Sequence, residues 1–331
     1  MENMSVKMNF VFFLYDTDYY RHAYYELTQY SDVRVYYGFR PNNPLMRFLH
    51  KIHHSLKLNH YLHLPFKQLW FKTYYKLDFE NSSKLCFVFD ARLLEFDYAR
   101  TFCNYLRSQH KDAYFVCYYQ DLIKTSTPEA KPNSLRDKFD LIVSYDKRDA
   151  ALYNIDYHPT TYSANVVDDN EGIEPCDVYF LGAAKNRLHD IIDTYCLLTN
   201  IGLKCDFYVT MPDGMEQINL KGIHYIKNMS YEKNLQHIKK SKFILELQQK
   251  DAIGPTLRTW EAICYDKFLI TNNTDIKNTN FYDNKFIILI NNDDIDFSCI
   301  DKNITYVNQL KEYINPRNFL NFLIFKLEKD I

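Results

Sequence analysis

The sequence predicts an α/β protein with two doubly wound domains, and three observations support this. Short, nearly continuous apolar runs alternate along the chain with stretches of helical character, as buried parallel strands and their crossover helices do. The same alternation occurs in both halves of the chain. The length of 331 residues fits two domains of ordinary size, and a hydrophobic content of 47% lets each of them bury its own core.

Five apolar runs of the first half are predicted strands, at residues 9–14, 33–37, 85–89, 113–119 and 141–145. We expect helices over residues 18–29, from Asp90 through Leu106, and shortly after Asp146. Strands that are apolar on both faces need helices on both faces, which predicts a buried parallel sheet.

Six runs of the second half repeat the scheme, at residues 177–181, 205–209, 223–226, 243–247, 268–271 and 286–290. Helices are expected over residues 187–200, 230–240 and 256–265, the second of them capped by Ser230. The run at 286–290 is expected to close the sheet.

The polar, proline-containing stretch at residues 158–175 is the predicted linker. It separates a first domain of residues 1–165 from a second domain of residues 175–310. Two doubly wound sheets of this kind bind ligands at the carboxyl ends of their strands. We therefore look for functional residues directly after the predicted strands.

Composition and charge exclude several classes of protein. A formal net charge of -2 is too small for the whole molecule to bind nucleic acid electrostatically. None of the eight cysteines forms a C-x-x-C pair and most lie in apolar surroundings, so we expect reduced thiols rather than disulfides or a zinc site. The N-terminus lacks the pattern of a signal peptide and no apolar stretch reaches about 20 residues, which predicts a cytoplasmic protein. The excess of Tyr and Phe over Gly suggests an AT-rich, bacterial genome.

The turn after the strand at 177–181 carries a candidate anion site. Gly182 begins a small-residue turn, and Lys185 and Arg187 follow at the start of the next helix. Backbone N–H groups at such a turn attract anions, and the two basic side chains add charge. The alternative is a tight turn with surface bases.

A second candidate element spans residues 253–262, Ile-Gly-Pro-Thr-Leu-Arg-Thr-Trp-Glu-Ala. Gly254 and Thr256 stand at a helix start, where N–H groups and a hydroxyl can bind a diphosphate. Arg258 lies in the first turn, and Glu261, on the same face, can accept hydrogen bonds from both hydroxyls of a ribose. The alternative for Arg258 and Glu261 is an exposed i,i+3 ion pair.

This Gly-x-Thr-x-Arg-x-x-Glu-Ala pattern, with residues 266–273 after it, resembles the donor-binding domain of GT-B glycosyltransferases, above all bacterial enzymes of lipopolysaccharide and capsular polysaccharide biosynthesis. The resemblance covers roughly the last half of the chain. It implies two Rossmann-like doubly wound domains facing a cleft, with a helical tail at 311–331 that packs back on the first. It also implies that Glu261 holds the ribose of a nucleotide-sugar donor, in the first place a UDP-sugar, while Gly254 and Thr256 face the diphosphate.

The chain departs from that family at one position. The best-known retaining members carry a second Glu eight positions before the ribose Glu, where this chain has Ile253, with Asp251 and Glu246 further upstream. The choice between inversion and retention therefore stays open. No D-x-D motif follows a strand, so no metal is expected at the donor site; helix dipoles with Lys185 and Arg258 can offset the diphosphate charge instead.

Four predicted strands of the first half are followed by aspartates, namely Asp16, Asp90, Asp121 and Asp146. In a parallel sheet they share one carboxyl edge. An inverting transferase needs a base to deprotonate the acceptor hydroxyl, and a carboxylate suits that task. Asp16 and Asp90 are the candidates because each directly follows a strongly apolar strand, and Arg92 can hold a phosphate. The alternative for each aspartate is a helix cap or a turn residue.

Residues 33–77 contain no acidic residue but eight Lys or Arg residues, interleaved with apolar and aromatic side chains. Such a basic amphipathic stretch is typical of proteins that lie on an anionic membrane surface, and we expect residues 40–77 to form a helical segment with this role. The alternative is a helical subdomain with solvated lysines. The histidines are too irregularly spaced for a metal site, and no nucleic-acid partner is expected because no RNA-binding motif occurs.

The predicted function is a glycosyltransferase of the hexosyltransferase type. It moves a sugar from a nucleotide-sugar donor to a hydroxyl of a lipid-linked cell-surface saccharide, in the cytoplasm and at the inner face of the plasma membrane. Two alternatives stay open. One is a non-catalytic nucleotide- or glycan-binding protein, and the other is a peripheral membrane scaffold of the same fold.

Overall fold

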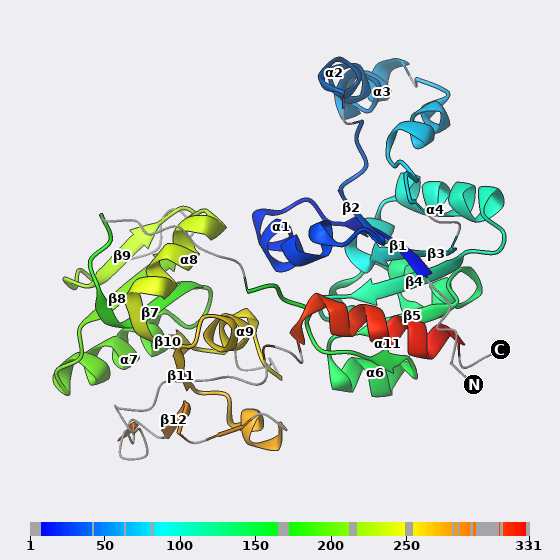
Figure 1. Cartoon of the computed structure of the whole chain (residues 1–331). Helices are drawn as coiled ribbons and strands as arrows, with labels where there is room; N and C mark the ends of the chain where they lie inside the picture. The colour runs from blue at the N-terminus through cyan, green and yellow to red at the C-terminus, as the bar shows by residue number, and fades with distance from the viewer. Residues whose placement is uncertain are drawn as a thin grey trace, which may run out of the picture. The chain divides into compact units, whose positions relative to one another are not determined.

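The chain divides into two compact units, which we call unit 1 (Met1–Thr161 with Pro316–Ile331) and unit 2 (Tyr162–Asn315). Figure 1 shows the elements of both. The computed structural model describes residues 8–41, 43–62, 64–80, 83–164, 172–211, 217–248, 254–279, 282–283, 285–291, 294–295, 311 and 314–328.

Unit 1 contains a six-stranded sheet in which all neighbouring strands are parallel, in the order β2-β1-β3-β4-β5-β6. The strands are β1 (Met8–Leu14), β2 (Val33–Tyr37), β3 (Lys84–Asp90), β4 (Tyr114–Tyr119), β5 (Leu141–Ser144) and β6 (Asp156–Tyr157). The five strands predicted for this half are confirmed. The sequence does not predict β6, because two residues are too few to show a strand period.

The connections of unit 1 are mostly helical: α1 (Asp18–Ala23), η1 (Tyr25–Gln29), η3 (Ala91–Glu95), α4 (Asp97–Gln109), η4 (Ile123–Thr125), η5 (Pro128–Ala130), α5 (Pro132–Leu135), η6 (Arg136–Lys138) and α6 (Lys147–Tyr153), where η denotes a 3-10 helix. The prediction of one continuous helix over residues 18–29, and of another after Asp90, is wrong. Each of these segments forms two helices separated by a break. The first break is at Tyr24 (φ -108°, ψ 11°) and the second at Phe96 (φ -90°, ψ 129°). Tyr24 is fully buried and hydrogen-bonds Gln120 at 2.6 Å, so its tertiary contacts outweigh its helical neighbours.

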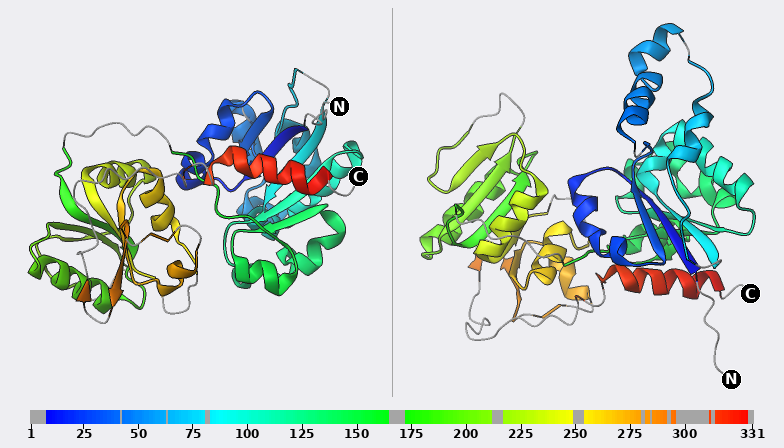
Figure 2. Two further views of the ribbon diagram at one scale, coloured as in Figure 1. Left: turned by 60° about the horizontal axis from the view of Figure 1, so that its bottom comes forward. Right: turned by 45° about the horizontal axis from the view of Figure 1, so that its top comes forward.

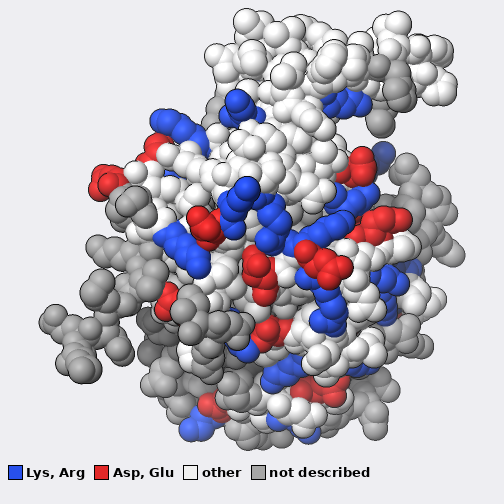
Figure 3. Space-filling view, turned by 90° about the vertical axis from the view of Figure 1, so that its right-hand side faces the viewer, with Lys and Arg blue, Asp and Glu red and all other residues white. Residues whose placement is uncertain are grey.

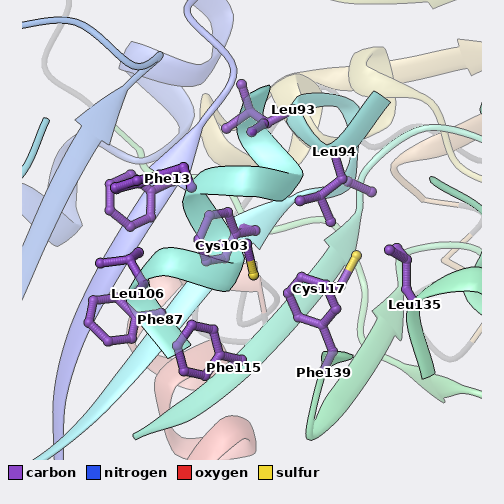
Figure 4. Close-up of a cluster of buried hydrophobic side chains, with 14 of the residues drawn as sticks. Phe13, Phe87, Leu93, Leu94, Cys103, Leu106, Phe115, Cys117, Leu135 and Phe139 are labelled. Atoms are coloured by element: carbon purple, nitrogen blue, oxygen red, sulfur yellow. The ribbon is translucent and has the colours of Figure 1, made fainter. Parts of the chain in front are cut away.

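One face of the unit 1 sheet is covered by an aromatic core. The ring of Phe13 on β1 lies 5.0 Å from that of Phe89 and 5.2 Å from that of Phe102 on α4, between centroids. Phe87 and Phe115 extend the cluster across the neighbouring strands (Figure 4). These tilted and edge-to-face arrangements are the ones that aromatic rings prefer. Part of the unusual aromatic content of the chain is therefore explained by this core.

The other face of the same sheet is covered by α11 (Pro316–Glu328), which lies along it in Figure 2. Phe319 is fully buried, and its ring lies 4.6 Å from that of Tyr118 and 4.8 Å from that of His158. Arg317 pairs with Asp32 at 3.1 Å near the start of the helix. The last helix of the chain therefore belongs to the core of unit 1.

Unit 2 contains a seven-stranded sheet in the order β13-β12-β11-β10-β7-β8-β9. The strands are β7 (Cys176–Ala183), β8 (Cys205–Thr210), β9 (Ile223–Ile226), β10 (Ser241–Glu246), β11 (Phe268–Thr271), β12 (Ile287–Asn291) and β13 (Asp294–Ile295). All pairs are parallel except β12 with β13. The prediction that the run at 286–290 closes the sheet is wrong, because the short antiparallel β13 adds an outer strand.

The helices of unit 2 include α7 (Leu188–Asn200), α8 (Tyr231–Lys240), α9 (Leu257–Cys264) and the 3-10 helix η7 (Thr274–Asn278). The predicted cap of α8 is confirmed, since Ser230 Oγ accepts the amide of Lys233 at 3.3 Å. Thr256 caps α9 in the same way, with its hydroxyl accepting the amide of Arg258 at 3.1 Å. Both helix starts are therefore fixed by local sequence.

Between β2 and β3 the chain makes a helical excursion, residues 43–80, which we call the arm. It contains α2 (Pro44–His53), α3 (Leu56–Leu62) and the 3-10 helix η2 (Lys67–Thr73). In Figure 1, α2 and α3 project from the rest of unit 1. The prediction of a helical segment here is confirmed.

Two further properties concern the described residues alone. None of their helices is long and apolar enough to cross a membrane. The seven cysteines among them are free thiols, and six of these are buried.

Phe319→Ala tests the packing of α11. We expect it to lower the free energy of unfolding by about 3–5 kcal/mol, because a buried ring is lost and a cavity is left. Asn321→Ala, on the exposed side of α11, should change that free energy by less than about 0.5 kcal/mol. Urea denaturation followed by circular dichroism measures both. Equal effects of the two changes would contradict the placement of Phe319 in the core.

Candidate active site

The carboxyl edge of the unit 1 sheet carries a row of acidic side chains. Strands β1, β3, β4 and β5 are adjacent and parallel, and Asp16, Asp90, Asp121 and Asp146 end or follow them. The prediction that the four carboxylates share one edge of the sheet is therefore confirmed. Their surroundings differ, and these decide which of them can act as a base.

Asp16 is held by two arginines. Arg21 donates to its Oδ1 from Nε at 3.0 Å and from Nη2 at 2.5 Å, and Arg40 forms an ion pair with its Oδ2. The two guanidinium groups compensate the charge of the Asp16 carboxylate in an ion-pair cluster. The Asp16 side chain is 29% exposed, so it can meet a ligand as part of this ion-pair cluster.

Asp90 is fully buried at the end of β3. Its Oδ1 accepts the amide of Arg92 at 2.9 Å, whereas Oδ2 has no hydrogen-bond partner among the described residues. Burial raises the pKa of Asp90 to about 6 and outweighs the neighbouring amides, Tyr20 and Arg92, which lower it. A carboxylate with one unpaired oxygen and a pKa near neutrality suits a general base.

Arg92 follows in η3 and pairs with Asp121 at 3.2 Å. Its guanidinium lies over the ring of Tyr15, 4.5 Å from the centroid, and both members of the ion pair are partly exposed. Arg92 is therefore accessible to an anion. Asp146, in contrast, caps α6 by accepting the amide of Asp149 at 2.8 Å, so the helix-cap alternative is confirmed for Asp146.

In unit 2, the turn after β7 anchors Arg187 on the backbone. Its Nε donates to the carbonyl of Ala183 at 3.1 Å, and its Nη1 contacts the carbonyl of Leu247 just after β10. Gly182 leaves the space for this side chain and for the ring of Phe180, because a Cβ added there would lie 2.6 Å from Cζ of Phe180 and 2.9 Å from Nη2 of Arg187. Lys185 is exposed, with its backbone in the left-handed region (φ 44°). The predicted basic turn thus consists of a fixed arginine and a solvent-facing lysine.

Glu246, at the end of β10, connects the start of α9 to the sheet through hydrogen bonds. Its Oε1 accepts the amide of Thr256 at 3.1 Å, the hydroxyl of Thr256 at 2.5 Å and that of Thr259 at 2.8 Å. Its Oε2 accepts the hydroxyl of Thr271 at 2.6 Å. The hydroxyl of Thr256, predicted to face a diphosphate, is thus bonded to Glu246. This structural role of Glu246 was not predicted, although a Glu within the apolar run 243–247 indicates a buried carboxylate that needs hydrogen-bond donors.

Arg258 and Glu261 form the predicted i,i+3 pair, but it is buried. The side chain of Glu261 is 0% exposed and that of Arg258 is 17% exposed, so the alternative of an exposed ion pair is wrong. Oε1 of Glu261 also accepts the hydroxyl of Tyr231 at 2.8 Å and the amide of Asn234 at 2.9 Å, both from α8. Three donors on a buried carboxylate compensate its desolvation.

Arg187 and Arg258, at the carboxyl edge of unit 2, lie close enough for their charges to interact. Burial and, after it, the charge of Arg258 lower the pKa of Arg187. Such a pair attracts an anion, since an anion relieves the repulsion between the cations. Gly254 (φ 83°) lies in the loop before α9. Ile253 and Asp251, compared above with the second Glu of retaining enzymes, lie outside the described residues.

The opposite, amino edge of unit 2 has a cavity of about 780 Å³ at the starts of β7, β8 and β9. Asp206 lies in its wall and contacts His224 at 3.1 Å and His237 at 3.3 Å. None of the predicted site residues lines this cavity. Among the described residues, no group of three or more His, Cys, Asp or Glu side chains is placed to hold a metal ion.

Comparison with known proteins identifies the fold. No protein-family model matches the chain, and no curated protein matches it by sequence. Among solved structures, it is similar to an α-glucosyltransferase in complex with UDP-glucose and DNA containing an abasic site, with 10% identity, a TM-score of 0.53, and coverage of 97% of this chain and 94% of that one.

Two weaker similarities are to a DNA-modifying β-glucosyltransferase (13% identity, TM-score 0.44, coverage of 97% and 96%) and to the lipopolysaccharide outer core galactosyltransferase WaaB (10% identity, TM-score 0.36, coverage of 98% and 91%). The full-length similarity to the α-glucosyltransferase, together with the two mainly parallel sheets, assigns this chain the GT-B fold. The predicted fold class, with two Rossmann-like units, is confirmed.

Asp90→Asn tests the cost of burying this carboxyl group. Its pKa is about 6 in the folded chain against an ordinary value of 3.8, so the folded state binds the proton more tightly and stability falls as pH rises from about 4 to about 6. Above pH 6 the charged Asp90 costs at most about 3 kcal/mol, at about 1.4 kcal/mol for each pKa unit. Asp90→Asn should therefore raise the free energy of unfolding at pH 8 and change it little at pH 4.

Urea denaturation at both pH values measures this difference. Asp16→Asn is the matched control, because it removes an ion-paired carboxylate and should give no gain at pH 8. A loss of stability in Asp90→Asn at pH 8 would contradict the assignment of a strained, buried charge.

Proposed function

We propose that this protein is a glycosyltransferase that moves a sugar from a nucleotide-sugar donor to a hydroxyl group of an acceptor. The observation that carries the proposal is the cluster of Arg187, Arg258 and Glu261 at the carboxyl edge of unit 2. We assign donor binding to this cluster. Doubly wound sheets bind their ligands at this edge, and the two arginines supply positive charge for a diphosphate.

The sugar nucleotide is proposed to be a UDP-sugar, with Arg187, Arg258 and the solvent-facing Lys185 against the diphosphate. Glu261 is proposed to receive the ribose hydroxyls. Its oxygens now accept bonds from Tyr231, Asn234 and Arg258. A ribose hydroxyl is also a donor, so binding exchanges one donor on Glu261 for another rather than leaving the buried carboxylate unpaired.

Acceptor activation is assigned to Asp90 in unit 1. The acceptor oxygen attacks the anomeric carbon while the bond from that carbon to the diphosphate breaks. The hydroxyl proton passes to Asp90, and the nucleoside diphosphate leaves with its charge held by the arginines of unit 2. With a pKa of about 6, Asp90 is mostly charged at neutral pH and close to the optimum for a base. This course inverts the anomeric centre.

The acceptor is proposed to be a lipid-linked cell-surface saccharide of the lipopolysaccharide or capsule type, met at the inner face of the plasma membrane. The support is the sequence pattern around Arg258 and Glu261 and the basic, apolar arm. A hydroxyl group on DNA is the second candidate, because the α-glucosyltransferase of the same fold is described in a complex with DNA.

Donor binding is tested by thermal shift with UDP, GDP, CMP and their common sugars. A ligand at about 100 times its Kd adds roughly 2.7 kcal/mol of stability, which shifts the melting temperature measurably. We expect one nucleotide to shift it. Arg187→Ala should weaken that nucleotide at least about tenfold, since a charge-assisted bond is lost. Gly182→Ala should weaken it as well, because the added Cβ crowds both Arg187 and the ring of Phe180.

Lys242→Ala is the control for donor binding. Lys242 is an exposed cation at the start of β10 and pairs with Asp177, away from the carboxyl edge. Its removal should leave the affinity unchanged. The absence of a shift with every nucleotide, or an equal loss in Lys242→Ala, would contradict the proposed donor site.

Catalysis is tested by turnover with a saccharide panel and with duplex DNA. Asp90→Asn should lower kcat by about 10²–10⁴-fold, the usual contribution of a general base, and leave the nucleotide-induced shift intact. Glucosylated DNA as the product would select the second acceptor. Unchanged turnover in Asp90→Asn would contradict the role of this base, and no turnover with any acceptor would favour a non-catalytic binding protein.

A further inference from the structure

The arm turns the apolar side of its first helix outward. In α2, Leu45, Phe48, Leu49 and Ile52 follow the spacing i, i+3, i+4, i+7, so they share one face of the helix. These side chains are between 39% and 67% exposed, and no residue of α2 is buried. A helix on an ordinary core buries such a stripe, whereas α2 presents it to solvent.

Two histidines outside this stripe attach α2 to the rest of unit 1. His50 hydrogen-bonds the hydroxyl of Tyr74 at 2.8 Å, and Trp70 donates to Nδ1 of His53 at 2.6 Å. Burial lowers the pKa of His50 to about 4, so this side chain is neutral at physiological pH. The orientation of α2 is thus fixed by its polar side, and the outward stripe is a consequence of that attachment.

The second helix of the arm repeats the arrangement. Leu58, Tyr61 and Leu62 of α3 are spaced i, i+3, i+4 and are 36%, 83% and 67% exposed. Beyond α3, Phe66 and Leu69 are 74% and 76% exposed. Phe66 also has a left-handed backbone (φ 62°), which is rare for an aromatic residue and costs conformational energy. In Figure 3 the projecting arm is the largely white region at the top, without an acidic side chain on this side.

The charge of the arm indicates what covers this apolar surface. The only acidic residues of the arm are Asp78 and Glu80 at its C-terminal end, and residues 33–77 contain none. Lys51 on α2, Lys57 on α3 and Lys72 on η2 are exposed. A second copy of the arm would bring like charges together. Nucleic acid offers phosphates but no apolar phase for aliphatic side chains, and proteins bind it mainly through polar contacts. An anionic lipid bilayer offers both an apolar phase and negative charge.

We propose that the arm is a membrane-docking element, in which the stripes of α2 and α3 with Phe66 and Leu69 enter the acyl boundary and the lysines bind anionic headgroups. The arm is anchored to the sheet of unit 1, because Phe71 and Tyr74 pack on Phe102 of α4, with ring centroids 5.2 and 5.4 Å apart. Docking therefore fixes unit 1 at the membrane surface. Membrane docking itself does not depend on the proposed function. Its role in catalysis does, because docking would hold unit 1 at the surface where lipid-linked acceptors are found.

Sedimentation with vesicles tests this docking. Full-length protein should bind phosphatidylglycerol/phosphatidylcholine vesicles and bind pure phosphatidylcholine vesicles at least about tenfold more weakly, since each Lys near an anionic surface adds about 1 kcal/mol. Phe48→Ser with Leu62→Ser should weaken binding to both kinds of vesicle at least tenfold. Lys51→Gln with Lys57→Gln should remove most of the preference for anionic lipid. Both effects are expected without a change in melting temperature, because the substituted side chains are exposed.

Leu152→Ser is the matched control, since Leu152 is 72% exposed on α6 of the same unit and should leave vesicle binding unchanged. Failure of the wild-type protein to bind anionic vesicles would overturn the proposal. So would a stripe-dependent dimer in light scattering, or oligonucleotide binding that is lost in the stripe variant. The nucleotide-induced thermal shift of the stripe variant should equal that of the wild type, so failure of docking and failure of the donor site are measured separately.

Discussion

The burial of the parallel sheets is the constraint on which the rest of this structure depends. A strand covered by helices on both faces cannot carry exposed polar groups along its length, so polar residues gather where the strands end. In unit 1 this brings Asp16, Asp90 and Asp121 to one edge. In unit 2 it places Arg187 and Glu246 at the corresponding edge, beside the start of α9. Within each unit, the candidate site residues thus come from distant parts of the chain and lie at one edge because of sheet topology.

Three buried carboxylates show how differently such residues are used. Glu246 accepts four hydrogen bonds and joins α9 to the sheet. Glu261 accepts three, one of them from Arg258, and joins α9 to α8. Asp90 has an unpaired oxygen among the described residues and a raised pKa. Because a buried carboxylate with an unpaired oxygen is costly, stability explains the position of Asp90 less well than it explains those of Glu246 and Glu261.

Aromatic side chains occupy two different environments in unit 1. Around Phe13 and Phe102 they fill the core beside the sheet with tilted and edge-to-face contacts (Figure 4). On the arm, Phe48, Tyr61 and Phe66 are exposed. The amino-acid composition does not distinguish the buried aromatic residues of the core from the exposed ones of the arm. The difference arises because His50 and His53 attach α2 through its polar side, which leaves the apolar side without a protein partner among the described residues.

The sequence by itself determined the fold class, eleven of the thirteen strands among the described residues, the cap at Ser230 and the common edge of the four aspartates. Alternation, capping and strand ends are local patterns, which is why the sequence reveals them. It did not determine the break at Tyr24, the short strands β6 and β13, or the partners of Thr256 and Glu261. Tertiary structure decided these, since the bonds of Glu246 and the burial of Glu261 depend on residues up to 30 positions away. Whether a side chain is a ligand contact or a structural one depends on what the fold places beside it, and spacing along the chain carries no information on that.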